Sequence, residues 1–314
     1  MENLLQVYFN LFSRLKRASI NGARAPHKPI LLLSVVQLMD EGQIKNNQIY
    51  ITAELVARFK DNWNLYVNNT AFRPNFYLPF FHLRSDKFWH LKTYFGKEIV
   101  LTGSASIGSF AQLKEVIEYA YLDEELFLFL SISENRQMVL NYLRVHYFDK
   151  YNVDSVSTGI IHEIEKQILH DSPATYRQYL EGADEEDIFI RSAVFKKEIP
   201  RIYNHTCCIS GLQIITGYNI QMVDACHIVP FAVSHDDTIT NGLSLSPNLH
   251  RAFDRGLISV DENYMVRVSA HITEPDYANN LRSFAGKQLL LPVDKPYLPE
   301  ISNLQWHTAN IFKQ

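Results

Sequence analysis

The hydrophobic positions of the N-terminal third repeat mostly with the period of a helix. Apolar residues recur every three or four positions from Leu4 to Arg17, and Asn21-Gly22 interrupts that pattern. A second, strongly apolar segment opens at Pro29 and continues to about Gly42, and Thr52 precedes a third as a cap. The pattern therefore predicts three helices in this part of the chain.

The pattern then changes twice before the middle of the chain. The aromatic-rich stretch from Phe76 to Leu91 favours two strands on either side of a turn, and residues 109–149 return to helical spacing. Residues 151–185 are more polar and favour a connector with one short helix. We therefore expect a helix-rich α+β domain over residues 1–150.

The C-terminal part alternates short strands and helices. The acidic run Asp184–Asp187 favours the start of a helix, because negative charge stabilises a helix N-terminus. Further on, strands are expected at Val223–Val229 and Leu243–Leu245, and Ser246-Pro247 predicts the start of a helix. This order of strand, loop, strand and helix predicts a second α+β domain over residues 186–314, with residues 151–185 as the connector.

The net charge of −4 conceals an uneven distribution along the chain. Residues 1–110 hold 13 basic and 7 acidic residues, residues 111–190 hold 6 and 16, and residues 191–314 hold 11 of each. A basic block is typical of a surface that binds a nucleic-acid backbone, whereas the acidic middle also fits solvated helix faces. The apolar runs are too short for a membrane span, no signal peptide is recognisable, and 3 cysteines without disulfide-like spacing favour the cytoplasm.

Three polar residues of the C-terminal part form a candidate catalytic set. His227 falls on the first predicted strand, Asn241 at the start of the second, and His250 on the helix. A neutral imidazole can accept a proton from water near neutral pH, so His227 is expected to be the general base of a phosphodiester hydrolysis. Asn241 is expected to hold the loop, because a side-chain amide can bridge two backbone groups.

Hydrolysis of a phosphodiester also needs a divalent cation, for which we expect Mg²⁺ or Mn²⁺. His250 is the first candidate ligand, Asp254 lies on the same helix face, and Asp224 is a third candidate. A structural zinc site is not expected because the cysteines cannot supply two ligand pairs. A thiol hydrolase is not expected because Cys226 and His227 are neighbours on a strand and point to opposite faces.

The segment that contains these residues resembles the restriction-type branch of the HNH (ββα-metal) endonucleases. The resemblance rests on the family pattern HIxP, followed by NGLxLxPxxHxxFDxGLI, which the sequence matches from His227 to Ile258. It implies a ββα-metal fold, a catalytic role for His227, Asn241 and His250, and double-stranded DNA as the substrate. Many members have Asp or His before the general base, where this chain has Cys226. Either Cys226 is a packing residue, or the site accepts softer ions.

The N-terminal part resembles the sulfur-binding domain that precedes HNH modules in McrA-like type IV restriction enzymes, which act in phage defence. The resemblance rests on Gly22–Leu33 and Leu78–Trp89, above all on His-Lys-Pro before an apolar helix. It implies recognition of phosphorothioate DNA. The expected DNA-binding residues are three cations at the helix start, two pocket residues and one weaker candidate: Arg24, His27, Lys28, Leu78, Pro79 and Arg84. The family usually has Tyr where this chain has Leu78, which leaves the modification open, and the motif could also simply begin a core helix.

Three functions follow from these observations. The first is a modification-dependent restriction endonuclease, which as a double-strand cutter would act as a homodimer. The second is a non-catalytic DNA reader or regulator that retains an HNH fold. The third is an HNH nuclease of phage or toxin type with an unrelated N-terminal part. Cleavage of modified and unmodified DNA distinguishes the three.

Overall fold

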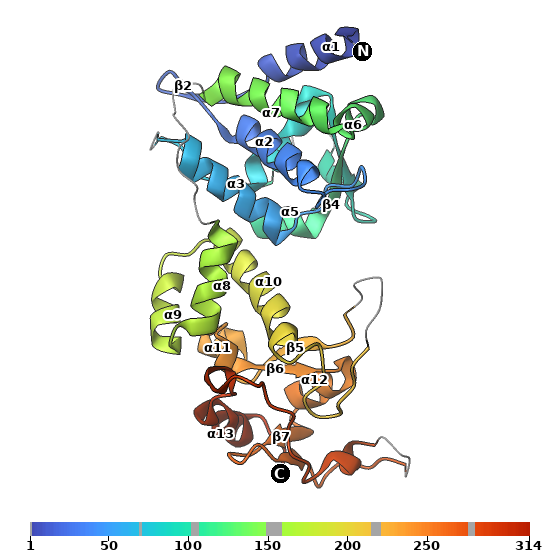
Figure 1. Cartoon of the computed structure of the whole chain (residues 1–314), viewed down its shortest axis with the longest axis vertical. Helices are drawn as coiled ribbons and strands as arrows, with labels where there is room; N and C mark the ends of the chain where they lie inside the picture. Colours follow the sequence, from blue (N-terminus) through green and yellow to red (C-terminus); the bar gives the residue numbers. More distant parts are fainter. Residues whose placement is uncertain (1, 69–70, 102–106, 149–158, 215–220, 276–279) are drawn as a thin grey trace. The chain divides into compact units, whose positions relative to one another are not determined.

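The structure is a computed structural model of the chain, and it describes residues 2–68, 71–101, 107–148, 159–214, 221–275 and 280–314. It divides into two compact units, Met1–Ile161 and His162–Gln314 (Figure 1). Both units combine helices with small antiparallel sheets, which confirms the predicted α+β class. No helix among the described residues is long and apolar enough to cross a membrane.

The N-terminal unit is built around the apolar helix α2. Its elements in chain order are α1 (Glu2–Ser13), β1 (Ser19–Ile20), β2 (Ala23–Arg24), α2 (His27–Asp40), α3 (Ala53–Tyr66), α4 (Tyr77–His82), η1 (Leu83–Asp86), β3 (Trp89–Thr93), η2 (Glu98–Leu101), α5 (Phe110–Val116), β4 (Ile117–Leu122), α6 (Glu124–Leu130) and α7 (Ser133–Phe148). Helix α2 packs between α3 and α7, and nearly all of its residues are buried (Figure 1). The Thr52 side chain accepts a hydrogen bond from the Leu55 backbone N–H at 3.2 Å, which is the predicted cap of α3.

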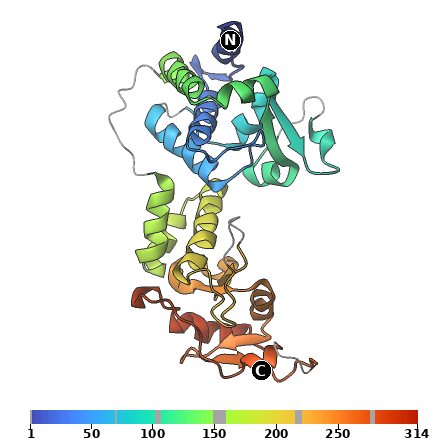
Figure 2. The ribbon, with the colours of Figure 1, turned by 45° about the vertical axis from the view of Figure 1, so that its right-hand side comes forward.

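Two predictions in this unit are wrong in secondary structure. The first half of Phe76–Leu91 forms helix α4 and the turn η1, not a strand. Phe76 and Phe80 are one helical turn apart and both are fully buried, so core packing overrides the preference of aromatic residues for strands. In the segment predicted to be all helical, β4 forms because it pairs with β3, with His90 opposite Tyr121. Figure 2 shows this pair of strands to the right of α2 and α3.

The C-terminal unit begins with helices and continues into two small sheets. Its elements are α8 (Ile160–His170), α9 (Pro173–Leu180), α10 (Glu185–Ile202), β5 (Asp224–His227), α11 (Phe231–Ser234), η3 (Ile239–Asn241), β6 (Gly242–Leu245), α12 (Pro247–Asp254), β7 (Ile258–Val260), β8 (Val266–Val268), η4 (Leu281–Phe284), η5 (Lys295–Tyr297) and α13 (Ile301–Asn310). Asp184 and Asp187 form a capping box at the start of α10, as the acidic run suggested. Strands β5 and β6 and helix α12 give the strand, strand and helix order expected from the sequence.

The sequence placed a connector at residues 151–185, and the structure divides the chain differently. The boundary between the two units falls between residues 161 and 162, so α9 and nearly all of α8 belong to the C-terminal unit. Both helices are amphipathic and bury side chains there, among them Ile168 and Tyr176. The predicted end of the first domain at residue 150 and start of the connector at residue 151 both fall within residues 149–158, which lie outside the described residues.

Candidate active site and N-terminal pocket

His227 ends strand β5, where it pairs with Gly242 of β6. Its ring stacks on Phe195 of α10, with the ring centroids 4.0 Å apart and the planes inclined by 9°. Its Nε2 lies 2.8 Å from Oδ1 of Asp237, a carboxylate that is 1% exposed. The His227 side chain itself is 22% exposed, so the ring is held firmly and still reaches solvent.

Asn241 is fully buried and clamps the loop between β5 and β6. Its Oδ1 accepts a hydrogen bond from the Val229 backbone N–H at 2.9 Å. Its Nδ2 donates to the carbonyl oxygens of Val229 and Asp236, both at 3.0 Å. One amide therefore bridges two stretches of backbone, which is the geometry that the loop-holding role of Asn241 requires.

Helix α12 carries His250 and Asp254 on one face, four residues apart. His250 Nε2 lies 3.5 Å from an oxygen of Asp254, and its Nδ1 lies 3.3 Å from Asp224 of β5. The three side chains are half-buried to exposed. An imidazole nitrogen beside a carboxylate suits a divalent cation such as Mg²⁺ or Mn²⁺, so His250 Nε2 and Asp254 could hold the expected ion, whereas Asp224 contacts the other ring nitrogen of His250.

Cys226 completes a cluster with His250 and Asp254 whose possible ligand atoms lie within 4.8 Å of one another. Its thiol is buried and donates a weak hydrogen bond to Asp254 Oδ1 at 3.8 Å. Burial, together with the negative charge of Asp254, raises the pKa of the Cys226 thiol well above its usual range. A neutral thiol is a poor metal ligand, so this geometry favours the packing alternative for Cys226.

The His227 and His250 rings line the same cavity, which has a volume of about 240 Å³. Asp254 and His307 of α13 line it as well. His307 is 2% exposed and stacks on Phe253, and both of its ring nitrogens have hydrogen-bond partners. Burial lowers the pKa of His307 to about 4, so this ring is neutral near pH 7 and forms part of the wall.

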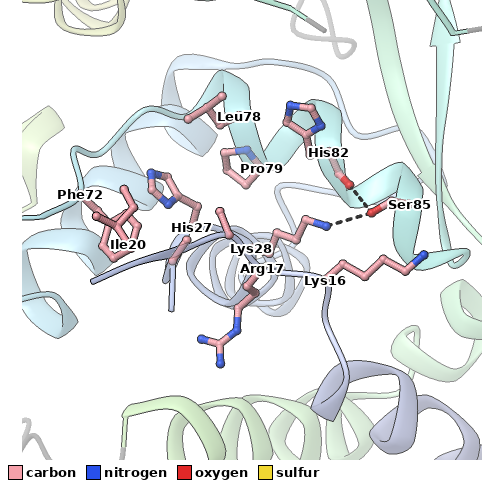
Figure 3. Close-up of a pocket in the computed structure, with 12 residues that line it drawn as sticks. Lys16, Arg17, Ile20, His27, Lys28, Phe72, Leu78, Pro79, His82 and Ser85 are labelled. Carbon is pink, nitrogen blue, oxygen red and sulfur yellow. Dashed lines mark hydrogen bonds between the residues drawn. The ribbon is translucent and has the colours of Figure 1, made fainter. Parts of the chain in front are cut away.

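A second cavity, of about 460 Å³, lies in the N-terminal unit (Figure 3). Its wall is largely apolar and is lined by Lys16, Arg17, Ala18, Ile20, Ala25, His27, Lys28, Phe72, Leu78, Pro79, His82 and Ser85. The structure therefore brings together four residues that the sequence selected from two distant segments: His27, Lys28, Leu78 and Pro79.

His27 and Lys28, the two polar residues of this cavity that the sequence selected, are both engaged with other groups of the protein. His27 lies 2.8 Å from the carbonyl oxygen of Arg73, to which its Nε2–H donates, and burial lowers the pKa of its ring. Lys28 forms a buried ion pair with Asp86 at 2.5 Å and donates to Ser85 at 3.0 Å, as Figure 3 shows for Ser85. Burial also lowers the pKa of Lys28. His27 and Lys28 therefore do not supply the two free cations that the sequence suggested.

Arg24 and Arg84 do not line this cavity. Arg24 is exposed on β2, and Arg84 donates to the Leu101 carbonyl at 3.0 Å and lies over the Phe81 ring. Sequence reasoning overlooked two cations of the cavity, Lys16 and Arg17, which follow α1. A pair of basic residues at the end of an amphipathic helix was their only sequence signal.

Sequence reasoning also overlooked the residues that hold His227. Phe195 and Tyr176 precede the motif along the chain, and no local spacing connects them to it. Asp237 was visible only as one of two adjacent loop aspartates. Their arrangement depends on tertiary packing of α9 and α10 beside the two strands.

A protein-family model matches the segment that carries this site. Residues 207–261 match the model of a family described as "HNH endonuclease". A solved structure titled "Modification dependent TagI restriction endonuclease" is similar at 22% identity, over 39% of this chain and 39% of that chain, with a TM-score of 0.30. This chain thus covers well under two thirds of that protein, and no curated protein matches. The family match thus lies wholly in the C-terminal unit and contains His227, Asn241, His250 and Asp254.

Proposed function

We propose that this chain is a metal-dependent endonuclease that cuts double-stranded DNA and that its cutting depends on a modification of the DNA. The nuclease half of the proposal rests on one observation above all, the convergence of His227, His250 and Asp254 on a single cavity. A partly exposed imidazole is in place to accept a proton from water. The half-buried His250 and the exposed Asp254 are in place to bind a divalent cation.

The metal is proposed from the donor set. His250 Nε2 faces Asp254, and the buried Cys226 thiol directs its hydrogen toward the same carboxylate. A bound Mg²⁺ or Mn²⁺ would neutralise charge on the scissile phosphate. The chain's own residues orient that site: Asp224 contacts the other ring nitrogen of His250 and fixes the plane of the ring.

The modification dependence is proposed from the cavity of the N-terminal unit. Its wall is largely apolar, burial lowers the pKa of its two histidines, His27 and His82, and Lys28 is already paired, so this part of the wall offers little to a hydrated phosphate oxygen. A soft, weakly hydrated atom such as the sulfur of a phosphorothioate suits such a wall. Lys16 and Arg17, at the edge of the same cavity, are in place to attract the neighbouring backbone charge.

The test compares matched duplexes that carry one phosphorothioate linkage, 5-methylcytosine or no modification, with Mn²⁺ or Mg²⁺ at a fixed salt concentration. We expect the phosphorothioate duplex to be cut at least about tenfold faster than the plain one, since each tenfold corresponds to about 1.4 kcal/mol of discrimination. Equal cutting of all three duplexes contradicts the modification dependence and leaves the nuclease. Binding without cutting in any metal supports the alternative of a non-catalytic reader.

The homodimer is proposed from need, because each chain has one HNH domain and a double-strand break has two cuts. Sedimentation of the chain on a phosphorothioate duplex that contains one site tests it. Two chains per duplex are expected. One chain per duplex together with nicked products contradicts the dimer.

A further inference from the structure

A buried chain of two hydrogen bonds leads from helix α9 to the ring of His227. The Tyr176 hydroxyl donates to Oδ2 of Asp237 at 3.1 Å, and Asp237 Oδ1 lies 2.8 Å from His227 Nε2. Tyr176 is 0% exposed and Asp237 is 1% exposed, so solvent does not compete for these contacts. The HNH match begins at residue 207, which places Tyr176 outside it.

The proton positions along this chain follow from what each group can do. An ionised carboxylate only accepts hydrogen bonds, so the Tyr176 O–H and the His227 Nε2–H must both donate to Asp237. Burial and the charge of Asp237 raise the pKa of Tyr176, so its hydroxyl keeps its proton. The lone pair of His227 then lies on Nδ1, for which the described part of the chain offers no hydrogen-bond partner.

We propose that Asp237 and Tyr176 are positioning residues that hold His227 as its Nε2–H tautomer and leave its Nδ1 to act as the base. This inference rests on the proposed hydrolysis and names the atom that performs the proton transfer. Nδ1 accepts one proton from the attacking water as the water oxygen bonds to phosphorus. The bond from phosphorus to the leaving oxygen breaks, and that oxygen takes a proton from solvent. The imidazolium formed lies against the Asp237 carboxylate, which stabilises its charge.

Two further contacts limit the movement of this assembly. The Phe195 ring stacks on His227 and fixes the plane of the imidazole. The Arg191 guanidinium lies over the Tyr176 ring, 5.2 Å from its centroid, and donates to Gln167 of α8 at 2.8 Å. Helices α8, α9 and α10 therefore support the base from outside the matched segment.

The first experiment separates positioning from mere structural support. Asp237→Asn keeps the size of the side chain, and Tyr176→Phe removes only the hydroxyl. We expect single-turnover cutting to fall roughly 100-fold for Asp237→Asn, within the usual contribution of a general base. A smaller loss of about three- to tenfold is expected for Tyr176→Phe, since a neutral hydrogen bond to the carboxylate contributes on the order of 1 kcal/mol.

The dissociation constant for DNA is expected to remain unchanged in both variants. Tyr179→Phe, on the same helix and also near Arg191, is the matched control and is expected to cut normally.

The second experiment observes the tautomer directly, without metal or DNA. In ¹⁵N-histidine-labelled protein, the His227 signals are those that disappear in His227→Gln. We expect the Nε2–H pattern in the wild type and in Tyr179→Phe, and a mixture of the two tautomers in Asp237→Ala.

An Nδ1–H pattern in the wild type, or full cutting by Asp237→Asn, overturns the inference. An unchanged Nε2–H pattern in a folded Asp237→Ala protein overturns it as well. A wild-type protein that cuts no DNA refutes the proposed function instead, because the tautomer remains measurable.

Discussion

The two cavities of this chain contain similar residue types in opposite states. In the nuclease cavity, His227 and His250 are partly exposed, and carboxylates contact their ring nitrogens. In the N-terminal cavity, His27 is buried against a backbone carbonyl and Lys28 is neutralised by Asp86. The first arrangement leaves basic groups available at a surface. The second removes charge from an apolar wall.

This difference matches the two proposed roles, hydrolysis at the nuclease cavity and recognition of modified DNA at the N-terminal cavity. Proton transfer and metal binding need lone pairs and charges that reach the substrate, which is what the proposed hydrolysis requires of the nuclease cavity. The proposed selection of a weakly hydrated atom needs an apolar wall at the point of contact, with cations such as Lys16 and Arg17 placed for the neighbouring phosphates. Residue type alone is therefore a poor guide to role, and the partner of each polar group decides it.

The contrast between the two cavities requires that DNA is cut at the nuclease cavity, and removal of His227 tests this. We expect His227→Ala to lower plasmid nicking by about a thousandfold, within the range for loss of a general base, with DNA affinity unchanged. His235→Asn, in the loop that Asn241 clamps, is the control, because Asn tolerates the left-handed backbone of that exposed position. Equal losses in the two variants would point to a disturbed loop and not to a missing base.

The two carboxylates beside His250, Asp254 and Asp224, are expected to differ in their effect on metal binding. A chelator is expected to abolish nicking, and Asp254→Asn is expected to weaken Mn²⁺ binding by at least about 100-fold, as measured by calorimetry. Asp224→Asn is expected to cost less, about tenfold, because Asp224 is not among the residues that line the cavity and its carboxylate lies 3.3 Å from Nδ1 of His250, on the side of the ring away from Asp254. The reverse order would make Asp224 the principal carboxylate ligand.

The buried neutral histidines make a prediction about acid stability. The pKa of His307 is about 4 in the folded chain and near 6.5 when unfolded, so only the unfolded chain gains this proton between those values. Its contribution to stability is complete above pH 6.5 and is lost as the pH falls toward 4. We expect a loss of about 2 kcal/mol from pH 7.5 to 5 that His307→Gln lacks. Urea unfolding of both proteins at the two pH values measures the difference. An identical pH dependence would show that His307 is not held neutral.

The smallest expected effect concerns the apolar wall of the N-terminal cavity. Leu78→Gln places a polar amide there and is expected to reduce the preference for the phosphorothioate duplex about tenfold, with plain DNA unaffected. Leu78→Met, which is similar in volume and remains apolar, is the control. A preference that survives Leu78→Gln would move the recognition surface elsewhere.

The fold was readable from sequence where a local signal determined the structure. Thr52 caps α3, and Gly256, with φ of 69°, ends α12 where a side chain would meet the Ile311 carbonyl. Local signals failed between Phe76 and Leu91 and again at β4. In both places the outcome depends on partners distant in sequence, such as the pairing of Trp89 with Leu122. Helical and extended spacing cannot be distinguished over such short apolar runs.

The residues that line the nuclease cavity were easier to predict from the sequence than the residues that hold His227 in place. His227, Asn241, His250 and Asp254 carry a spacing that reflects two strands and a helix, so their proximity could be inferred. Nothing in that spacing indicates which partner each ring nitrogen contacts. The N-terminal cavity shows the same limit, because the ion pair of Lys28 with Asp86 joins residues 58 positions apart and has no local signal in the sequence.

Gly242 has a consequence for dissecting this enzyme. A Cβ at this position would lie 2.0 Å from Ile199 and 3.2 Å from Phe195. Helix α10 therefore packs so closely against strand β6 that only glycine fits there. Truncation to the 55 residues of the recognisable motif would remove this helix and expose the ring of the base. Engineers who transplant the catalytic segment should therefore carry over the preceding three helices as one cassette.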